Sequence, residues 1–152
     1  MLRSATLSDL ESVASWVTTP KDCEHWAGWR VSFPINLESL ASAIEFTVAN
    51  AFSLIDHREL VAFGQLVRKS SDRGHLARLI VNPLRRRRGY GEVLVRALLE
   101  EARQKSFERV SLNVNASNAS AVSLYLKLGF ADAVRPPDEP ESPGTRYMHR
   151  AA

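Results

Sequence analysis

Hydrophobic and polar positions recur along this chain with two different periods, and each period predicts one kind of element. Between residues 8 and 17, apolar side chains recur three and four positions apart, as on one face of a helix. Ser8 followed three residues later by Glu11 has the pattern of a capping box, which predicts the start of this helix. A second helix is expected over 37–49, capped by Asn36. Shorter apolar runs bounded by turn residues predict strands.

The other elements follow from the same patterns. We expect strands over residues 2–6, 52–55, 60–67, 76–81, 110–114, 131–134 and 146–149. Helices are expected after Gly89 and over 120–128, the latter ended by Gly129. Residues 18–34 show no period and are expected to be irregular. The resulting order is β-α-α-β-β-β-α-β-α-β-β, an α/β (α+β) mixture with three antiparallel strands in succession.

Length and composition limit the class of protein. A chain of 152 residues predicts a single domain over 1–152, and 45% hydrophobic residues suffice for a core. No apolar run approaches the roughly 20 residues of a membrane span, and the first residues lack a signal-peptide pattern. The one cysteine, Cys23, excludes an internal disulfide and fits a reducing compartment. We therefore expect a cytoplasmic protein that contacts no membrane.

Four consecutive arginines, Arg85 to Arg88, carry the basic character of the chain. The net charge of +3 comes from 20 basic and 17 acidic residues, and without these four arginines it would be −1. Because the basicity is local rather than spread over a surface, a nucleic-acid-binding module is a disfavoured alternative. The run follows a predicted strand and precedes a predicted helix, which favours a small phosphate ligand.

The loop from Arg86 to Gly91 has the features of a pyrophosphate site. A helix start offers unpaired backbone N–H groups and a partial positive charge. Gly89 and Gly91 let the backbone approach an anion closely, and the arginines add fixed cationic charge. The loop is neither a Walker A sequence nor a dinucleotide fingerprint, since Leu94 stands where the third glycine of the fingerprint would be.

The string Arg86-x-x-Gly89-x-Gly91 resembles the acetyl-CoA loop of the GCN5-related N-acetyltransferase (GNAT) superfamily. A second motif of that family, Asn-x-x-Ala-x-x-Leu-Tyr-x-x-x-Gly-Phe, is matched at every spacing by Asn118, Ala121, Leu124, Tyr125, Gly129 and Phe130. The resemblance implies the GNAT fold, a mixed, mostly antiparallel sheet flanked by helices. It also implies transfer of an acetyl group from acetyl-CoA, as co-substrate, to a primary amine by direct attack in a ternary complex, without a metal ion.

The same resemblance assigns positions that bind the cofactor. Leu79, Ile80 and Val81 would lie where the fourth strand splays from the fifth, with pantetheine in the gap. Val81 would pair with pantetheine amides, and the Leu79 N–H would stabilise the oxyanion formed from the thioester. Asn118 would contact pantetheine or cap the next helix. The pyrophosphate would be held by Arg86, Arg87, Arg88, Gly89, Tyr90 and Gly91.

Two residues are candidates for proton transfer. Tyr125 would give a proton or a hydrogen bond to the departing CoA thiolate, because a phenol keeps its proton at neutral pH. The alternative is that Tyr125 only packs beside its helix. His75 stands four residues before Leu79, where some histone-modifying members have a glutamate, and its ordinary pKa suits a general base. If His75 is instead a surface residue, water or a backbone carbonyl would take the proton.

The acceptor site is expected in two segments, 18–36 and 135–145. Their candidate side chains are Trp26, Trp29 and Phe33 in the first and Asp138, Glu139 and Glu141 in the second. Aromatic faces and carboxylates suit a cationic amine, such as a polyamine-like molecule, a peptide N-terminus or a lysine. The alternative is that the aromatic residues anchor the core and the acidic loop is solvated. A non-catalytic acetyl-CoA sensor and a homodimer contact also stay open.

Overall fold

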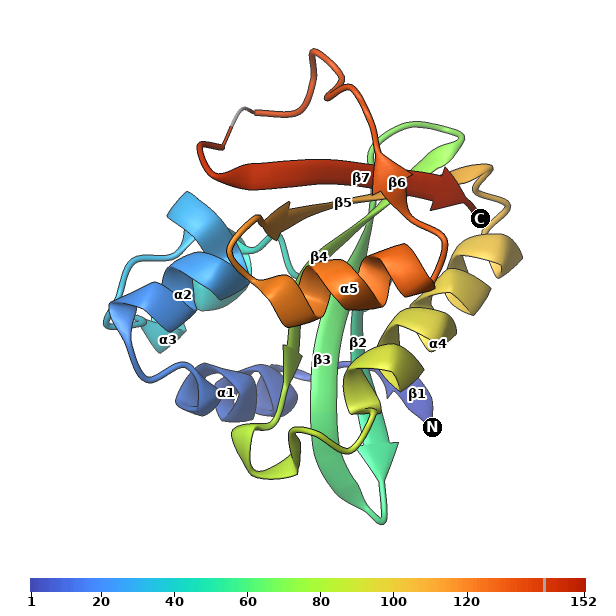
Figure 1. Ribbon diagram of the computed structural model, residues 1–152. Coiled ribbons are helices and arrows are strands. Elements are labelled where there is room, and N and C mark those ends of the chain that lie inside the picture. The colour runs from blue at the N-terminus through green and yellow to red at the C-terminus, as the bar shows by residue number, and fades with distance from the viewer. Residues whose placement is uncertain (141) are drawn as a thin grey trace.

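Seven strands form one sheet with helices on both faces (Figure 1). The computed structural model describes residues 1–140 and 142–152. The strands are β1 (Leu2–Ser4), β2 (Ala51–Asp56), β3 (Glu59–Arg68), β4 (Arg73–Val81), β5 (Arg109–Asn115), β6 (Ala131–Asp132) and β7 (Thr145–Ala151). The helices are α1 (Leu7–Trp16), α2 (Pro20–Ala27), α3 (Leu37–Ala43), α4 (Tyr90–Gln104) and α5 (Ala119–Lys127), with 3₁₀ turns η1 (Gly28–Arg30) and η2 (Pro83–Arg85).

The sheet is mixed and mostly antiparallel, as predicted. Its strand order is β1-β2-β3-β4-β5-β7-β6. The pair β4 and β5 is parallel, and the other neighbouring pairs of described strands are antiparallel. None of the described helices has the length and apolar character needed to cross a membrane.

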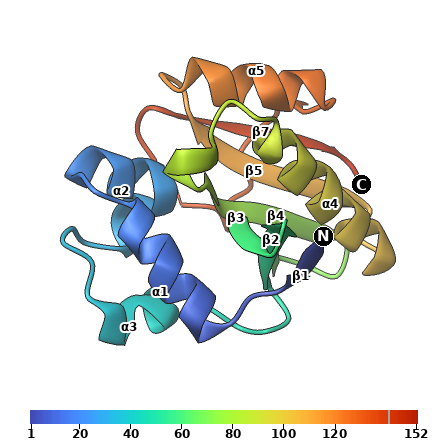
Figure 2. The ribbon, with the colours of Figure 1, turned by 90° about the horizontal axis from the view of Figure 1, so that it is seen from below.

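Two hydrophobic clusters fill the space on opposite faces of the sheet. Helices α4 and α5 cover one face, and α1 to α3 cover the other (Figure 2). Ala62 and Leu66 of β3 belong to the cluster under α4 and α5, while Phe63 belongs to the cluster under α1 to α3. Because both faces of β3 are buried, its sequence is a nearly continuous apolar run rather than an alternating one.

Helix α1 begins two residues earlier than the sequence pattern predicts. Its cap is Thr6, which forms a capping box with Asp9, so the predicted cap at Ser8 was wrong. Burial alone would raise the pKa of Asp9. Hydrogen bonds from Arg3, the Thr6 backbone and Ser53 instead lower it to about 2. This ionised carboxylate ties the start of the helix to β1 and β2.

Two other helices also depart from the predicted pattern. Residues 18–34, expected to be irregular, contain α2, which is capped by Thr19. At eight residues, α2 is about two turns long, too short for its apolar period to stand out. Helix α3 ends at Ala43 rather than at residue 49, and Glu45 with φ 54° turns the chain away. Val48, which falls within the predicted helix, is therefore outside α3 and 71% exposed.

Candidate functional site

Strands β4 and β5 start as a parallel pair and then separate. Their shared register ends at Leu76 and Leu112. Beyond these residues, β4 stays paired with β3 as far as Val81, and β5 stays paired with β7 as far as Asn115. The facing edges of the two described strands therefore share no ladder at this end. Such a gap can receive an extended ligand whose amides pair with a strand edge.

A β-bulge shapes the β4 side of the gap. Gly64 of β3 stands opposite both Arg78 and Leu79, and Arg78 has the left-handed φ of 51°. A β-carbon at Gly64 would collide with the end of the Leu79 side chain, which would then have to shift. The Arg78 carbonyl accepts a hydrogen bond from Trp26 Nε1 at 3.0 Å. This bond fixes the bulge to α2.

Near the end of β4, one backbone N–H group points into the gap. The Asn82 N–H donates to the Val61 carbonyl of β3 at 2.8 Å. Since successive N–H groups of a strand point to opposite edges, the Val81 N–H points away from β3 and toward the gap.

The loop between β4 and α4 leaves its backbone N–H groups free. The Asn82 side chain fixes the start of the loop by accepting from the Leu84 N–H at 3.0 Å. Arg87 and Gly89 have left-handed φ values of 63° and 82°, and Gly89 caps α4. Within the described chain, the N–H groups from Arg86 to Gly89 donate to no protein acceptor. Together with the start of α4, they form an anion-binding concavity.

The arginines of this loop divide into two groups. Arg85 pairs with Glu59 at 2.7 Å, so its charge is compensated by the protein. Arg86 to Arg88 are exposed and form no ion pair with any described residue. Tyr90 donates from its hydroxyl to Asp56 at 2.5 Å, a bond that raises the pKa of Tyr90 and ties α4 to the β2–β3 turn.

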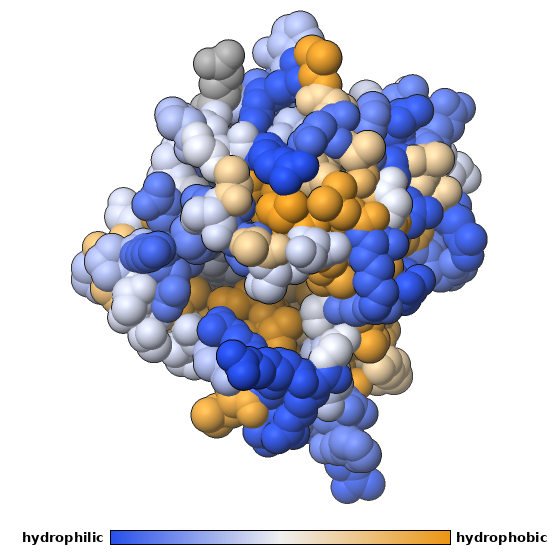
Figure 3. Space-filling view, in the orientation of Figure 1, coloured by the Kyte–Doolittle hydropathy of each residue, from blue (hydrophilic) through white to orange (hydrophobic). Residues whose placement is uncertain are grey.

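The two sequence motifs meet beside the gap. A β-carbon at Gly91 would lie 3.7 Å from Leu124 of α5 and 3.9 Å from Val81 of β4. Asn118 caps α5, its side chain accepting from the Ala121 N–H at 3.3 Å. Figure 3 shows a recess with a hydrophobic floor between the hydrophilic loop and the region of α5. The arrangement offers an anion site at one end of an apolar recess.

Tyr125 lies on the buried face of α5. Its side chain is 9% exposed and meets Phe130 edge-on, with ring centroids 5.8 Å apart. Burial raises the pKa of Tyr125 to about 12. Its hydroxyl forms no hydrogen bond to the part of the protein that the structure describes. The phenol is thus neutral at physiological pH and keeps its proton.

His75 is buried, and the alternative that it is a surface residue was wrong. It is 5% exposed, its Nδ1 lies 2.7 Å from Ser111 Oγ, and its Nε2 lies 3.4 Å from Asn113 Nδ2. Burial, reinforced by nearby cations that include Lys69 and Arg73, lowers the pKa of His75 to about 3. A group of such low basicity is a weak proton acceptor near neutral pH. This geometry favours a positioning role for the imidazole.

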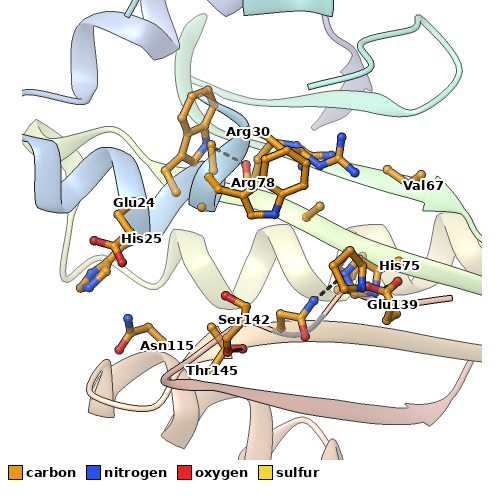
Figure 4. Close-up of a pocket in the computed structure, with 18 of the residues that line it drawn as sticks. Glu24, His25, Arg30, Val67, His75, Arg78, Asn115, Glu139, Ser142 and Thr145 are labelled. Atoms are coloured by element: carbon orange, nitrogen blue, oxygen red, sulfur yellow. Dashed lines mark hydrogen bonds and ion pairs between the residues drawn. The ribbon is translucent and has the colours of Figure 1, made fainter. Parts of the chain in front are cut away.

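A pocket of about 540 Å³ opens on the α2 side of the gap (Figure 4). It is lined by residues 24–30 of α2 and η1, by 75–78 of β4, by Asn113 and Asn115 of β5, and by the β6–β7 loop. We call it the β4–β5 pocket. Among the described residues, no group of His, Cys, Asp and Glu could hold a metal ion.

Two of the three predicted aromatic residues reach this pocket. Trp26 is buried and Trp29 is 72% exposed, and both line it, whereas Phe33 does not. Trp26 therefore packs in the core and also forms part of the pocket wall. Arg78 is a lining residue that sequence patterns do not single out, because it faces the pocket only through the bulge.

The acidic loop faces cations of the protein itself. Asp138 pairs with Arg73 at 3.2 Å and does not line the pocket. Glu139 has a side chain that is 4% exposed, lies 3.4 Å from Lys69 Nζ and does line it. Glu141 lies outside the described residues. The expectation of a solvated loop is thus wrong for Glu139, and the loop adds little free negative charge to the pocket.

Comparison with known proteins finds one matching family model and several similar acetyltransferases. A model of the Acetyltransferase (GNAT) family matches residues 15–130. The ribosomal protein bS18-alanine N-acetyltransferase of Escherichia coli is 33% identical over 82 residues, which are 54% of this chain and 55% of that protein. Mycothiol acetyltransferase of Corynebacterium efficiens is 30% identical over 138 residues, 88% of this chain and 46% of that one. The chain thus spans about half the length of the curated relatives it matches.

A solved structure extends the likeness to the whole fold. The crystal structure of the Escherichia coli ribosomal-protein-S18-alanine N-acetyltransferase is similar with a TM-score of 0.70 at 26% identity. The similarity covers 99% of this chain and 92% of that one.

Proposed function

We propose that this chain, which belongs to the acetyltransferase (GNAT) family, moves an acetyl group from acetyl-CoA to a primary amine within a ternary complex. One observation carries the proposal: β4 and β5 separate beside a loop whose N–H groups are unpaired within the described chain. The loop can hold a diphosphate, and the gap can receive the extended amide chain that follows it. The names of both curated relatives, as acetyltransferases, support the same reaction.

In this proposal the cofactor runs from the loop into the gap. Backbone N–H groups of Arg86 to Gly91 hold the pyrophosphate, and the exposed side chains of Arg86, Arg87 and Arg88 add attraction. Pantetheine follows the edge of β4 at Leu79, Ile80 and Val81 and pairs with the Val81 N–H. Asn118, while capping α5, lies at the other side of this path.

The transfer itself forms one bond and breaks one. The amine nitrogen attacks the thioester carbonyl carbon, the C–N bond forms, and the C–S bond breaks to release the CoA thiolate. The Leu79 N–H stabilises the oxyanion of the tetrahedral intermediate. Tyr125 donates a hydrogen bond to the thiolate. Because a thiol has a pKa of about 8.5 and Tyr125 about 12, the phenol stabilises the sulfur charge without giving up its proton completely.

The amine must also lose a proton. His75 is neutral and has both ring nitrogens near hydrogen-bonding neighbours, so we assign it to holding Ser111 and Asn113 in place. Water in the β4–β5 pocket carries the proton away. The carboxylate of Glu139, 3.4 Å from Lys69 Nζ, lines the same pocket and is the proposed end of this water path.

The test is release of free thiol from acetyl-CoA in the presence of an amine panel. The panel contains a polyamine, a peptide with a free N-terminus, a lysine peptide and single amino acids. The proposal predicts amine-dependent release of one thiol for each acetylated amine. If CoA raises the melting temperature but no amine causes thiol release, the chain is a non-catalytic acetyl-CoA-binding domain.

A further inference from the structure

Arg78 presents an uncompensated cation to the β4–β5 pocket. Its Nε donates to the neutral amide oxygen of Gln65. A guanidinium has five N–H donors, so those on Nη1 and Nη2 are left over. Within residues 1–140 and 142–152, no carboxylate lies within ion-pair distance of Arg78. Figure 4 shows the Arg78 side chain in the pocket beside Arg30.

The other charged groups of the pocket are mostly compensated. Arg30 pairs with Glu45 at 2.7 Å, and Lys69 lies 3.4 Å from Glu139. Glu24 is exposed on α2, at the other side of the pocket from Arg30 in Figure 4. Arg78 is therefore the cation without a carboxylate of its own among the described lining residues.

Partial burial makes an unpaired charge at Arg78 unfavourable. Burial, with a further contribution from Arg30, lowers the pKa of Arg78 to about 10, although Glu45 partly opposes the effect. Arg78 is half-buried, and a partly desolvated charge without a carboxylate partner is costly. A bound carboxylate would supply the missing partner, and the fork of a guanidinium matches its two oxygens.

We propose that Arg78 binds a carboxylate of the acceptor, so that the acceptor belongs to the class of amino acids rather than polyamines. This inference rests on the proposed function and names the substrate class of the same site. Arg78 directly precedes Leu79, whose N–H is assigned to the thioester. Adjacent residues of β4 would then hold the carboxylate and the thioester, which selects acceptors with few bonds between carboxylate and nitrogen.

Matched acceptors test this inference on the unaltered protein. Each free amino acid is compared with its carboxamide and with the amine that lacks the carboxylate, using kcat/KM corrected to the neutral amine. Loss of a charge-assisted pair predicts that kcat/KM falls roughly 10- to 100-fold from acid to amide. Equal kcat/KM values for acid and amide would overturn the inference and leave the acetyltransferase proposal standing.

Variants then assign the preference to Arg78. Arg78→Gln should bring the ratio of acid to amide near one while activity on the amide persists, and Arg78→Lys should give an intermediate ratio because it keeps charge but not the fork. Arg96→Gln, on the exposed face of α4, is the matched control and should keep the wild-type ratio. A purely structural Arg78 would lower activity on both acceptors equally, which would contradict the inference.

A binding measurement separates failure of this inference from failure of the enzyme proposal. If no amine causes thiol release, calorimetry compares N-acetyl amino acids with their carboxamides in the presence of CoA. Tighter binding of the acids, lost in Arg78→Gln, supports the carboxylate site. Equal binding, or none, overturns it. Should Arg78→Gln fail to fold, the wild-type comparison and Arg78→Lys still decide the question.

Discussion

Tyr125 and His75 are both buried, but burial has opposite effects on their affinity for protons. For the phenol it disfavours the anion and raises the pKa to about 12, and for the imidazole it disfavours the cation and lowers the pKa to about 3. Both side chains are consequently neutral over the physiological range. At the scale of single residues, Tyr125 can therefore donate a hydrogen bond, whereas His75 does not take up a proton near neutral pH.

Replacing Tyr125 by Phe tests the role of its hydroxyl. The ring still packs against Phe130, so we expect CoA affinity to change little while kcat falls by roughly 100-fold, a typical loss for an acid-base group. Tyr147→Phe removes another buried hydroxyl, one bonded to Arg73, and is the control. That variant should lose stability rather than kcat. Unchanged kcat in Tyr125→Phe would rule out the assigned role.

The neutral state of His75 predicts a pH dependence of stability. Below an ordinary histidine pKa of 6.5, His75 binds a proton in the unfolded chain. In the folded chain it binds this proton only near pH 3. The free energy of unfolding should therefore fall as the pH drops through this window, by up to about 1.4 kcal/mol per pH unit for this group. Urea denaturation of the wild type and His75→Gln measures the slope, which should be shallower in the variant.

The control for this measurement is His57→Gln, since the His57 side chain is 93% exposed. It should leave the pH slope of the wild type unchanged. Identical slopes in the wild type and in His75→Gln would show that the pKa of His75 is the same in the folded and unfolded states.

At the scale of elements, local patterns predicted most of the fold but not the shape of its site. The loop before α4 and the helix α5 were correctly predicted as elements, because their glycines, arginines and apolar residues act within a few positions of one another. The bulge was not, because it depends on Gly64 facing Arg78 and Leu79 across two strands. The cation in the pocket follows from that bulge. The predicted cationic acceptor rested on aromatic and acidic residues, and the described acidic ones, Asp138 and Glu139, pair with arginine and lysine.

Gly89 tests the phosphate loop as an element. Its φ of 82° disfavours any side chain, although a β-carbon there would have no atom within 4 Å. Gly89→Val should strain the backbone by about 1–2 kcal/mol and shift the N–H groups that hold the pyrophosphate. We expect CoA affinity, measured by calorimetry, to fall about tenfold.

Gly144 provides a matched control, with φ 77° and equally open surroundings in the β6–β7 loop. Gly144→Val should lower the melting temperature to a similar extent and leave the Kd for CoA unchanged. Equal Kd values of CoA for Gly89→Val and the wild type would contradict the binding of the pyrophosphate by this loop.

At the scale of the whole molecule, the net charge of +3 is small and unevenly distributed. The exposed arginines Arg86 to Arg88 have no ion-pair partner among the described residues, whereas Arg96 and Arg103 of α4 pair with glutamates on their own helix. The local field of the loop, more than the total charge, should therefore attract an anionic cofactor.

Salt dependence measures this attraction. Rising ionic strength should weaken CoA binding, because exposed charges are screened within a Debye length of about 10 Å at 0.1 M. Replacing Arg86 to Arg88 by alanine should weaken binding at low salt and flatten its salt dependence. Replacing Arg96, Arg103 and Arg109 removes the same charge elsewhere and should preserve the slope. Equal slopes in the two triple variants would contradict a local role for the loop.

The proposed function depends on CoA lying along the edge of β4 with its diphosphate on the following loop. Amide hydrogen exchange, with and without saturating CoA, tests this most directly. We expect slower exchange in residues 79–81 and 86–91, with little change on the outer strands β1 and β6. Binding of CoA without protection in these two segments, or no binding at all, would contradict it.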